Sequence, residues 1–140
     1  MVHQVEAAVI YFLRGLFPNA KRYRNEFSSG GEWIPSFPAV MVRVESLVPE
    51  QVYGNGEVCS YEGSIIVYIG GKLNSPEESE EFIPTVIERV VNAVINANGL
   101  GFTDVTGQAR YIGLEFREVR YVESEYGVEI YAVSINYSIT

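Results

Sequence analysis

Few residues of this chain have side chains suited to catalysis or metal binding. The sequence contains one histidine, His3, and one cysteine, Cys59. A zinc site built from several Cys and His ligands, and a disulfide within the chain, are therefore both excluded. A nucleophilic cysteine needs a neighbour that lowers its thiol pKa, and only the distant His3 is available. We expect His3 to be a solvated surface residue and Cys59 a buried strand residue, with no catalytic residue, no metal and no cofactor.

Two glycine-rich segments have the composition of phosphate-binding loops but not their spacing. Gly70-Gly71-Lys72 follows a predicted strand, yet Ile66 stands where the P-loop needs its first glycine, and Leu73 replaces the Ser or Thr that binds magnesium. The pair Gly99 and Gly101 follows a predicted helix, whereas the dinucleotide fingerprint follows a strand. We interpret both segments as turns.

The charged residues are mostly acidic, and the formal net charge is −8. This balance argues against nucleic-acid binding, which depends on clustered Lys and Arg. We interpret the basic group Lys21, Arg22 and Arg24 as a solvated edge. The acids concentrate in two places, at residues 77–81 and 115–129. No pattern separates one protonated from one ionised carboxylate, as acid–base catalysis requires. In the second group Glu115, Glu118 and Glu129 alternate with Arg117 and Arg120, which predicts cross-strand ion pairs.

Aromatic residues make up 13% of the chain, and several fall in predicted loops. Tyr and Trp are enriched at protein interfaces because they present a large rigid surface with a polar end. Residues 28–38 are rich in Gly, Ser and Pro but also contain large apolar side chains. We select as candidate partner contacts Trp33, Ile34, Phe37, Tyr53 and Tyr126.

The first half of the chain predicts one helix followed by strands. Apolar residues at helical spacing predict a helix over 2–16 that ends near Phe17, because Pro18 cannot continue it. Residues 20–27 are a possible short strand. Clean alternation predicts a strand over 39–45. The polar residues 49–56, which include Asn55-Gly56, predict a turn, and residues 57–69, apolar over 65–69, predict a long second strand. The two strands together form a hairpin.

The second half predicts a helix and a hairpin. Ser75, Pro76 and Glu78 have the pattern of a capping box, so we expect the helix to begin at Ser75. Pro84 should kink this helix or restart it near Ile83. Strands are predicted over 111–122 and 128–139, joined by a loop over 123–127. The whole, residues 1–140, is expected to be a single α+β domain of order α-β-β-β-α-β-β, a mainly antiparallel sheet with two helices packed on it.

The apolar content of 47% excludes general disorder. No apolar run approaches the length of a membrane span, and the N-terminal residues lack the pattern of a secretory signal. We therefore expect no contact with a membrane.

The order of elements and their hydrophobic pattern resemble the tail-terminator, or tail-completion, family of long-tailed bacteriophages. The matching segments cover nearly the whole chain: the helix VEAAVIYFLRGLFPNA, the strand entry IPSFPAVMVRVES, the strand GSIIVYIGG, the acidic helix SPEESEEFIPTVIERVVNAV and the hairpin GLEFREVRYVESEYGVEIYAVSINY. The resemblance lies in this order and pattern, since the family has no invariant motif and no catalytic residues to carry over.

The resemblance implies a structural virion protein, made in the host cytoplasm. Its copies would form a ring, usually a hexamer, that caps the tail tube and joins it to the head connector. The implied partners are further copies of the chain, the tail-tube protein and the head-connector protein, and DNA would pass nearby without specific binding. The residues leave an alternative open: a small non-enzymatic ligand-binding or regulatory module that acts as a dimer, with a cleft between helix and sheet as its pocket.

Overall fold

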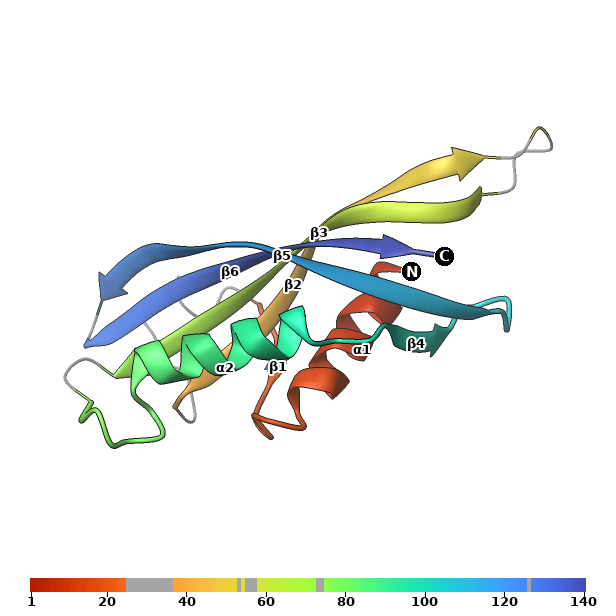
Figure 1. The fold of residues 1–140 in the computed structure, drawn as a ribbon. Helices are drawn as coiled ribbons and strands as arrows, with labels where there is room; N and C mark the ends of the chain where they lie inside the picture. The colour runs from red at the N-terminus through yellow and green to blue at the C-terminus, as the bar shows by residue number, and fades with distance from the viewer. Residues whose placement is uncertain (25–36, 53, 55–57, 73–74, 126) are drawn as a thin grey trace.

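One sheet organises the chain (Figure 1), and its described part has six strands. The computed structural model describes residues 1–24, 37–52, 54, 58–72, 75–125 and 127–140. In these residues the strands lie in the order β1-β2-β3-β6-β5-β4. All neighbouring strands are antiparallel except β1 and β2, which are parallel. The strands are β1 (Lys21–Arg22), β2 (Ala39–Val52), β3 (Val58–Lys72), β4 (Leu100–Thr103), β5 (Ala109–Glu125) and β6 (Val128–Ile139).

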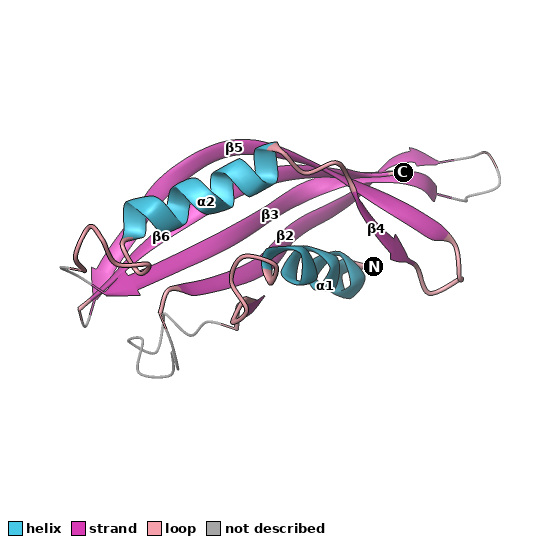
Figure 2. Cartoon of the chain, turned by 60° about the horizontal axis from the view of Figure 1, so that its bottom comes forward, coloured by secondary structure: helices cyan, strands magenta, loops and turns pink. Residues whose placement is uncertain are grey.

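The two helices α1 (Val2–Leu13) and α2 (Ile83–Ile95) cover the same face of the sheet (Figure 2). Residues four apart on each helix point into the layer between helices and sheet, as helical periodicity requires. They are Val5, Val9 and Leu13 on α1, and Val86, Val90 and Val94 on α2. The predicted class, a single α+β domain with two helices on a mainly antiparallel sheet, is confirmed. In the described part of the chain, no helix is long and apolar enough to cross a membrane.

The sheet curls around α1, because this helix contacts both β2 and β4, which lie near opposite edges of the sheet. A single carboxylate also fixes α1 to the β2 edge. Glu6 accepts a hydrogen bond of 3.0 Å from the backbone N–H of Val44 and another from Arg22 Nε. It occupies the edge of β2 just beyond the two-residue strand β1, so a side chain replaces the backbone partner that β1 no longer supplies.

The first hairpin is longer than predicted. β2 does not end before Pro49 but continues to Val52, paired with β3, so the predicted turn over 49–56 begins too early. Pro49 is tolerated because no other described strand pairs with the outer side of β2 at this point, and a missing N–H there breaks no ladder bond. β3 is a central strand and runs three residues further than expected, to Lys72.

The second helix begins at Ile83 and not at Ser75. Ser75 Oγ donates a hydrogen bond to the carbonyl of Lys72, so it does not cap a helix, and the predicted capping box is wrong. Pro84 instead occupies the first turn, where its fixed φ and missing N–H cause no loss. This is the restart near Ile83 that the sequence offered as one of two outcomes. The acids at residues 77–81 consequently precede α2, and its first turn contains none.

The second hairpin matches the prediction closely, with one addition. β6 covers the predicted residues, and its odd-numbered residues Val133, Ile135, Tyr137 and Ile139 face the helices. The hairpin turn is tighter than expected, with Gly127 in the left-handed region at φ 76°. The short strand β4 was not predicted. It pairs with the start of β5 over Ala109–Ile112 only.

Candidate functional site

Four of the five predicted contact residues, Trp33, Ile34, Tyr53 and Tyr126, lie outside the described residues. The fifth, Phe37, is half-buried. It packs on a second, smaller apolar cluster, on the face of the sheet away from the helices, formed by Ala39, Met41, Val128 and Ile130. Lys72 Nζ lies 5.7 Å from the centre of its ring. Phe37 therefore contributes to packing, and its use as a partner contact stays a prediction.

The single histidine is exposed but has a partner. Arg22 Nη2 lies 2.9 Å from His3 Nδ1, and the same guanidinium contacts Glu6 through its Nε. The expectation of a solvated histidine without a fixed neighbour is thus incomplete. These three side chains form a small network that connects α1 to β1. Because Glu6 also accepts a hydrogen bond from the backbone of β2, we interpret the network as stabilising the fold.

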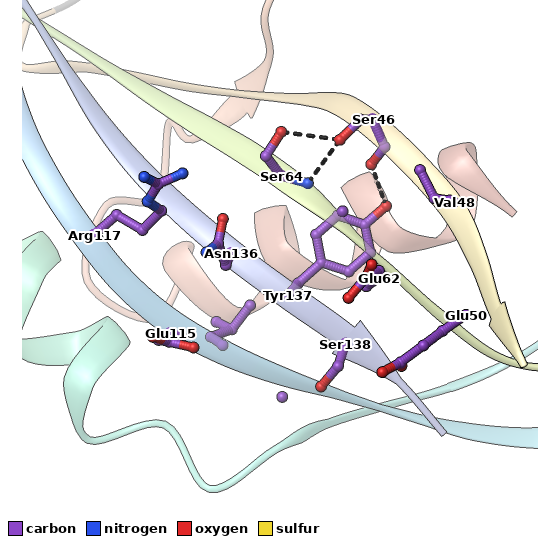
Figure 3. Close-up of a pocket in the computed structure, with 13 residues that line it drawn as sticks. Ser46, Val48, Glu50, Glu62, Ser64, Glu115, Arg117, Asn136, Tyr137 and Ser138 are labelled. Carbon is purple, nitrogen blue, oxygen red and sulfur yellow. Dashed lines mark hydrogen bonds between the residues drawn. The ribbon is translucent and has the colours of Figure 1, made fainter.

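A concave surface of about 690 Å³ lies over β2, β3, β6 and β5 (Figure 3). Small polar side chains, Ser46, Ser64, Asn136 and Ser138, contribute to its floor, and Ser46 Oγ is bonded to Ser64 at 3.0 Å. The charged groups at the rim are Glu50, Glu62, Glu115 and Arg117. Three carboxylates against one guanidinium give this surface an acidic character, suited to polar contacts with a protein and repulsive toward phosphates.

The shape of this surface depends on a contact that crosses three strands. Tyr137 of β6 lies against Gly63 of β3, and its hydroxyl donates a 2.6 Å hydrogen bond to the backbone carbonyl of Ser46 on β2. The register of β2 shifts between Val44 and Ser46, so the bond occurs where the regular ladder is interrupted. Burial raises the pKa of Tyr137 to about 12, which keeps the hydroxyl protonated as a donor.

The charges of the second hairpin are not paired as the sequence predicts. The register places Glu115 opposite Asn136, Glu118 opposite Ser134 and Arg120 opposite Ala132. Ion pairs such as Arg22 with Glu6 and Arg110 with Asp104 are present, but among the described residues none involves Glu115, Arg117, Glu118 or Arg120. For these four residues the prediction of cross-strand ion pairs is wrong. Small neutral residues on β6 leave the charges of β5 directed to solvent.

Two features were missed in the sequence. The first is the exposed surface of β5, where Val119, Tyr121 and Val122 are 37–51% exposed beside these charges. The alternation of charged and apolar residues in this strand could have indicated an exposed surface. We considered its pairing with β6 and not its other edge. The second is Asp104, the only aspartate, which is buried and bonded to Arg110 Nε at 3.0 Å. The motif Asp104-Val105-Thr106-Gly107 is a turn signal that was not recognised.

Asp104 organises the turn between β4 and β5. Its Oδ1 accepts hydrogen bonds from the Thr106 hydroxyl at 2.6 Å and from the backbone N–H groups of Thr106 and Gln108. The Thr106 hydroxyl, then Arg110 and these backbone groups, hold the pKa of Asp104 well below its usual range. The carboxylate is therefore ionised and fully bonded, as expected of a structural group.

Among the described residues, no group of three or more His, Cys, Asp or Glu side chains is arranged to bind a metal ion. Glu77, Glu78 and Glu80 are exposed ahead of α2. The backbone of Cys59 lies in β3. What the described surface offers is an acidic concave face and one exposed strand, both suited to contacts with other proteins. Compared with known proteins, the sequence matches no family model and no curated protein.

Proposed function

We propose that this chain is a structural protein of a bacteriophage virion, a tail terminator whose copies form a ring at the end of the tail tube. The observation that carries the proposal is the order of elements. The chain has a first helix, a long hairpin, a second helix and a closing hairpin, with the strands in one sheet. This is the order of elements in which the sequence resembles the tail-terminator family, with β4 as a short addition.

The distribution of surfaces also supports this function. A ring requires each copy to contact its neighbours through two different surfaces. The helices occupy one face of the sheet, and the other face stays open along the acidic concave surface. In this proposal the helical layer stabilises the subunit, and the open face and the β1–β2 edge contact neighbouring copies, the tail tube and the head connector.

The acidic balance fits the passage of DNA through such a ring. Glu50, Glu62 and Glu115 lie around the concave surface, and Glu77, Glu78 and Glu80 are exposed before α2. Carboxylates on a channel wall repel phosphates and prevent DNA from adhering. The proposal therefore places some of these acids toward the channel and assigns no catalytic residue.

Sedimentation with tail tubes from the phage that encodes this chain tests the proposal. A terminator binds tube ends, so the bound amount should follow the number of ends and not the total tube length. Shearing one tube preparation exposes new ends at constant mass. The amount of bound protein should therefore rise in proportion to the number of ends.

The refuting result is binding that follows total tube mass, or no binding at saturating protein. A matched control uses tubes already capped in finished virions, whose ends are occupied and should bind none. The alternative of a small regulatory dimer predicts no binding in any of these preparations, so the same experiment separates the two functions.

A further inference from the structure

Over most of its length, the outer edge of β5 has no partner among the strands that the structure describes. β4 pairs with β5 only over Ala109–Ile112, whereas β5 continues to Glu125. From Gly113 onward, the described residues place β6 on one side of β5 and no strand on the other. Unpaired N–H and C=O groups along such an edge are a template for pairing with another strand.

The sequence along this edge is complementary to itself when read in reverse. In an antiparallel pair of two β5 strands centred between Arg117 and Glu118, Arg117 lies opposite Glu118. On either side of this centre, charged residues lie opposite residues of the other sign, and apolar residues lie opposite apolar or aromatic ones. The pairs are Glu115 with Arg120, Phe116 with Val119, and Leu114 with Tyr121.

A β-bulge makes this register possible. In a regular strand, residues opposite each other about such a centre would point to different faces of the sheet. The register with β6 shifts between Phe116 and Glu118, so Arg117 is an extra residue. As a result, Glu115 and Arg120 share the face away from the helices, since they lie opposite Asn136 and Ala132.

The apolar residues match in the same way. Phe116 lies opposite Ile135 and Val119 opposite Val133, and both of these β6 residues face the helices. Each pair of the two-strand arrangement therefore meets on a common face. The exposed residues Val119 and Tyr121 would be covered by Phe116 and Leu114 of the other strand.

We propose that two copies of this chain associate through their β5 edges, antiparallel over residues 114–121, about a two-fold axis at the bulge. The four charges at the centre, which make no ion pair within the described chain, become complementary across the axis. This contact goes beyond the ring and does not depend on it, because a two-fold contact uses the same surface twice and closes with two copies.

Charges on an edge strand have another known use, which is to prevent pairing. The two uses predict opposite results. If Glu115 and Arg120 keep the edge single, neutral replacements should increase association. If they pair across a two-fold axis, like charges should weaken it and an exchange of the two charges should restore it.

Sedimentation equilibrium of the full chain without tail tubes, over a wide range of protein concentration, tests the proposal. We expect a monomer–dimer equilibrium in the parent chain. Arg120→Glu places glutamates opposite each other at two symmetric positions and should raise the dimer Kd at least about tenfold. Glu115→Arg should have a similar effect through two pairs of arginines.

The decisive variant combines both substitutions, Glu115→Arg with Arg120→Glu. It should return the Kd to within about threefold of the parent value, because the pairs are re-formed with exchanged signs. Glu88→Arg on the exposed surface of α2 is the matched control and should leave the Kd unchanged. Both β5 side chains are exposed, so thermal unfolding at low concentration should be unaffected.

The proposal is overturned if the parent chain stays monomeric at every concentration, if Arg120→Glu leaves the Kd unchanged, or if the double variant associates no better than the single ones. Increased association after Glu115→Gln and Arg120→Gln would also overturn it. These measurements use the protein without tail tubes, so they can disprove the β5 contact without affecting the proposed function, which is tested by binding to tube ends.

Discussion

Replacement of Gly63 by alanine should be among the most damaging small substitutions in the sheet. A Cβ at this position would lie 2.0 Å from the carbonyl oxygen of Ser46 and 2.8 Å from Cε1 of Tyr137. Contacts below 3.0 Å essentially never occur for real Cβ atoms, so β2 would have to move by about 1 Å. The obstructing atom belongs to the backbone, so no rotamer change relieves the clash.

The expected cost follows from two contributions. Overpacking in a filled interior costs about 1–3 kcal/mol. Movement of β2 also lengthens the 2.6 Å bond from Tyr137 to Ser46, whose loss costs about 1 kcal/mol. We expect Gly63→Ala to lower the free energy of unfolding by about 3 kcal/mol, or the Tm by about 10 °C in a chain of this size.

Urea denaturation followed by circular dichroism measures this loss. The slope against urea concentration should be unchanged while the midpoint falls. Gly101→Ala on β4 is the control, because its Cβ would lie 3.7 Å from the nearest atom, an ordinary contact with the Tyr111 ring. If both variants unfold within about 0.5 kcal/mol of the parent chain, the close approach of β6, β3 and β2 at Gly63 is refuted.

Three further substitutions test other parts of the fold. Tyr137→Phe should cost about 1–2 kcal/mol by leaving the Ser46 carbonyl without its donor, and ultraviolet titration of the parent chain should show a tyrosine that resists ionisation until about pH 12. Ile83→Ala, at the buried start of α2, should cost about 2–5 kcal/mol in the same denaturation assay. Asp104→Asn should destabilise the chain at pH 7. The pKa of Asp104 is depressed in the folded state, so the stability that its carboxylate contributes is fully present above about pH 4 and is lost as the pH falls further. The difference in unfolding free energy between Asp104→Asn and the parent chain should therefore shrink in acid. A difference that stays constant with pH would contradict the stabilising role of the ionised carboxylate.

Periodicity in the sequence was sufficient for the elements that have one buried face. From Val133 to Ile139 the residues of β6 alternate regularly, and each apolar residue in this range faces the helices. The same holds for α2 once Pro84 is placed in its first turn. The sequence pattern predicts these segments correctly because the periodicity of the helix or strand places the apolar residues on the face that is buried.

Features that depend on distant partners could not be predicted. Pro49 ends a strand in most contexts, but here it lies beyond the part of β2 that pairs with β1, which only the pairing of the strands reveals. Ser75 has the pattern of a cap, yet its hydroxyl bonds to Lys72 and the helix starts eight residues later. The four-residue strand β4 is too short to show an alternating pattern.

The candidate surface was predicted only in part. The charges at Glu115, Arg117, Glu118 and Arg120 were recognised, but alternation along one strand does not reveal what lies opposite on the next. Cross-strand pairing was the natural expectation, and the register with small residues of β6 contradicts it. The complementarity of β5 with itself becomes visible only when the bulge at Arg117 is known.

Electron microscopy of tail tubes mixed with the protein would show whether this chain closes the tube. If it is a terminator, a ring should appear at one end of each tube, with no copies of the chain on the tube wall. Bare ends at saturating protein, or decoration along the whole tube, would contradict it.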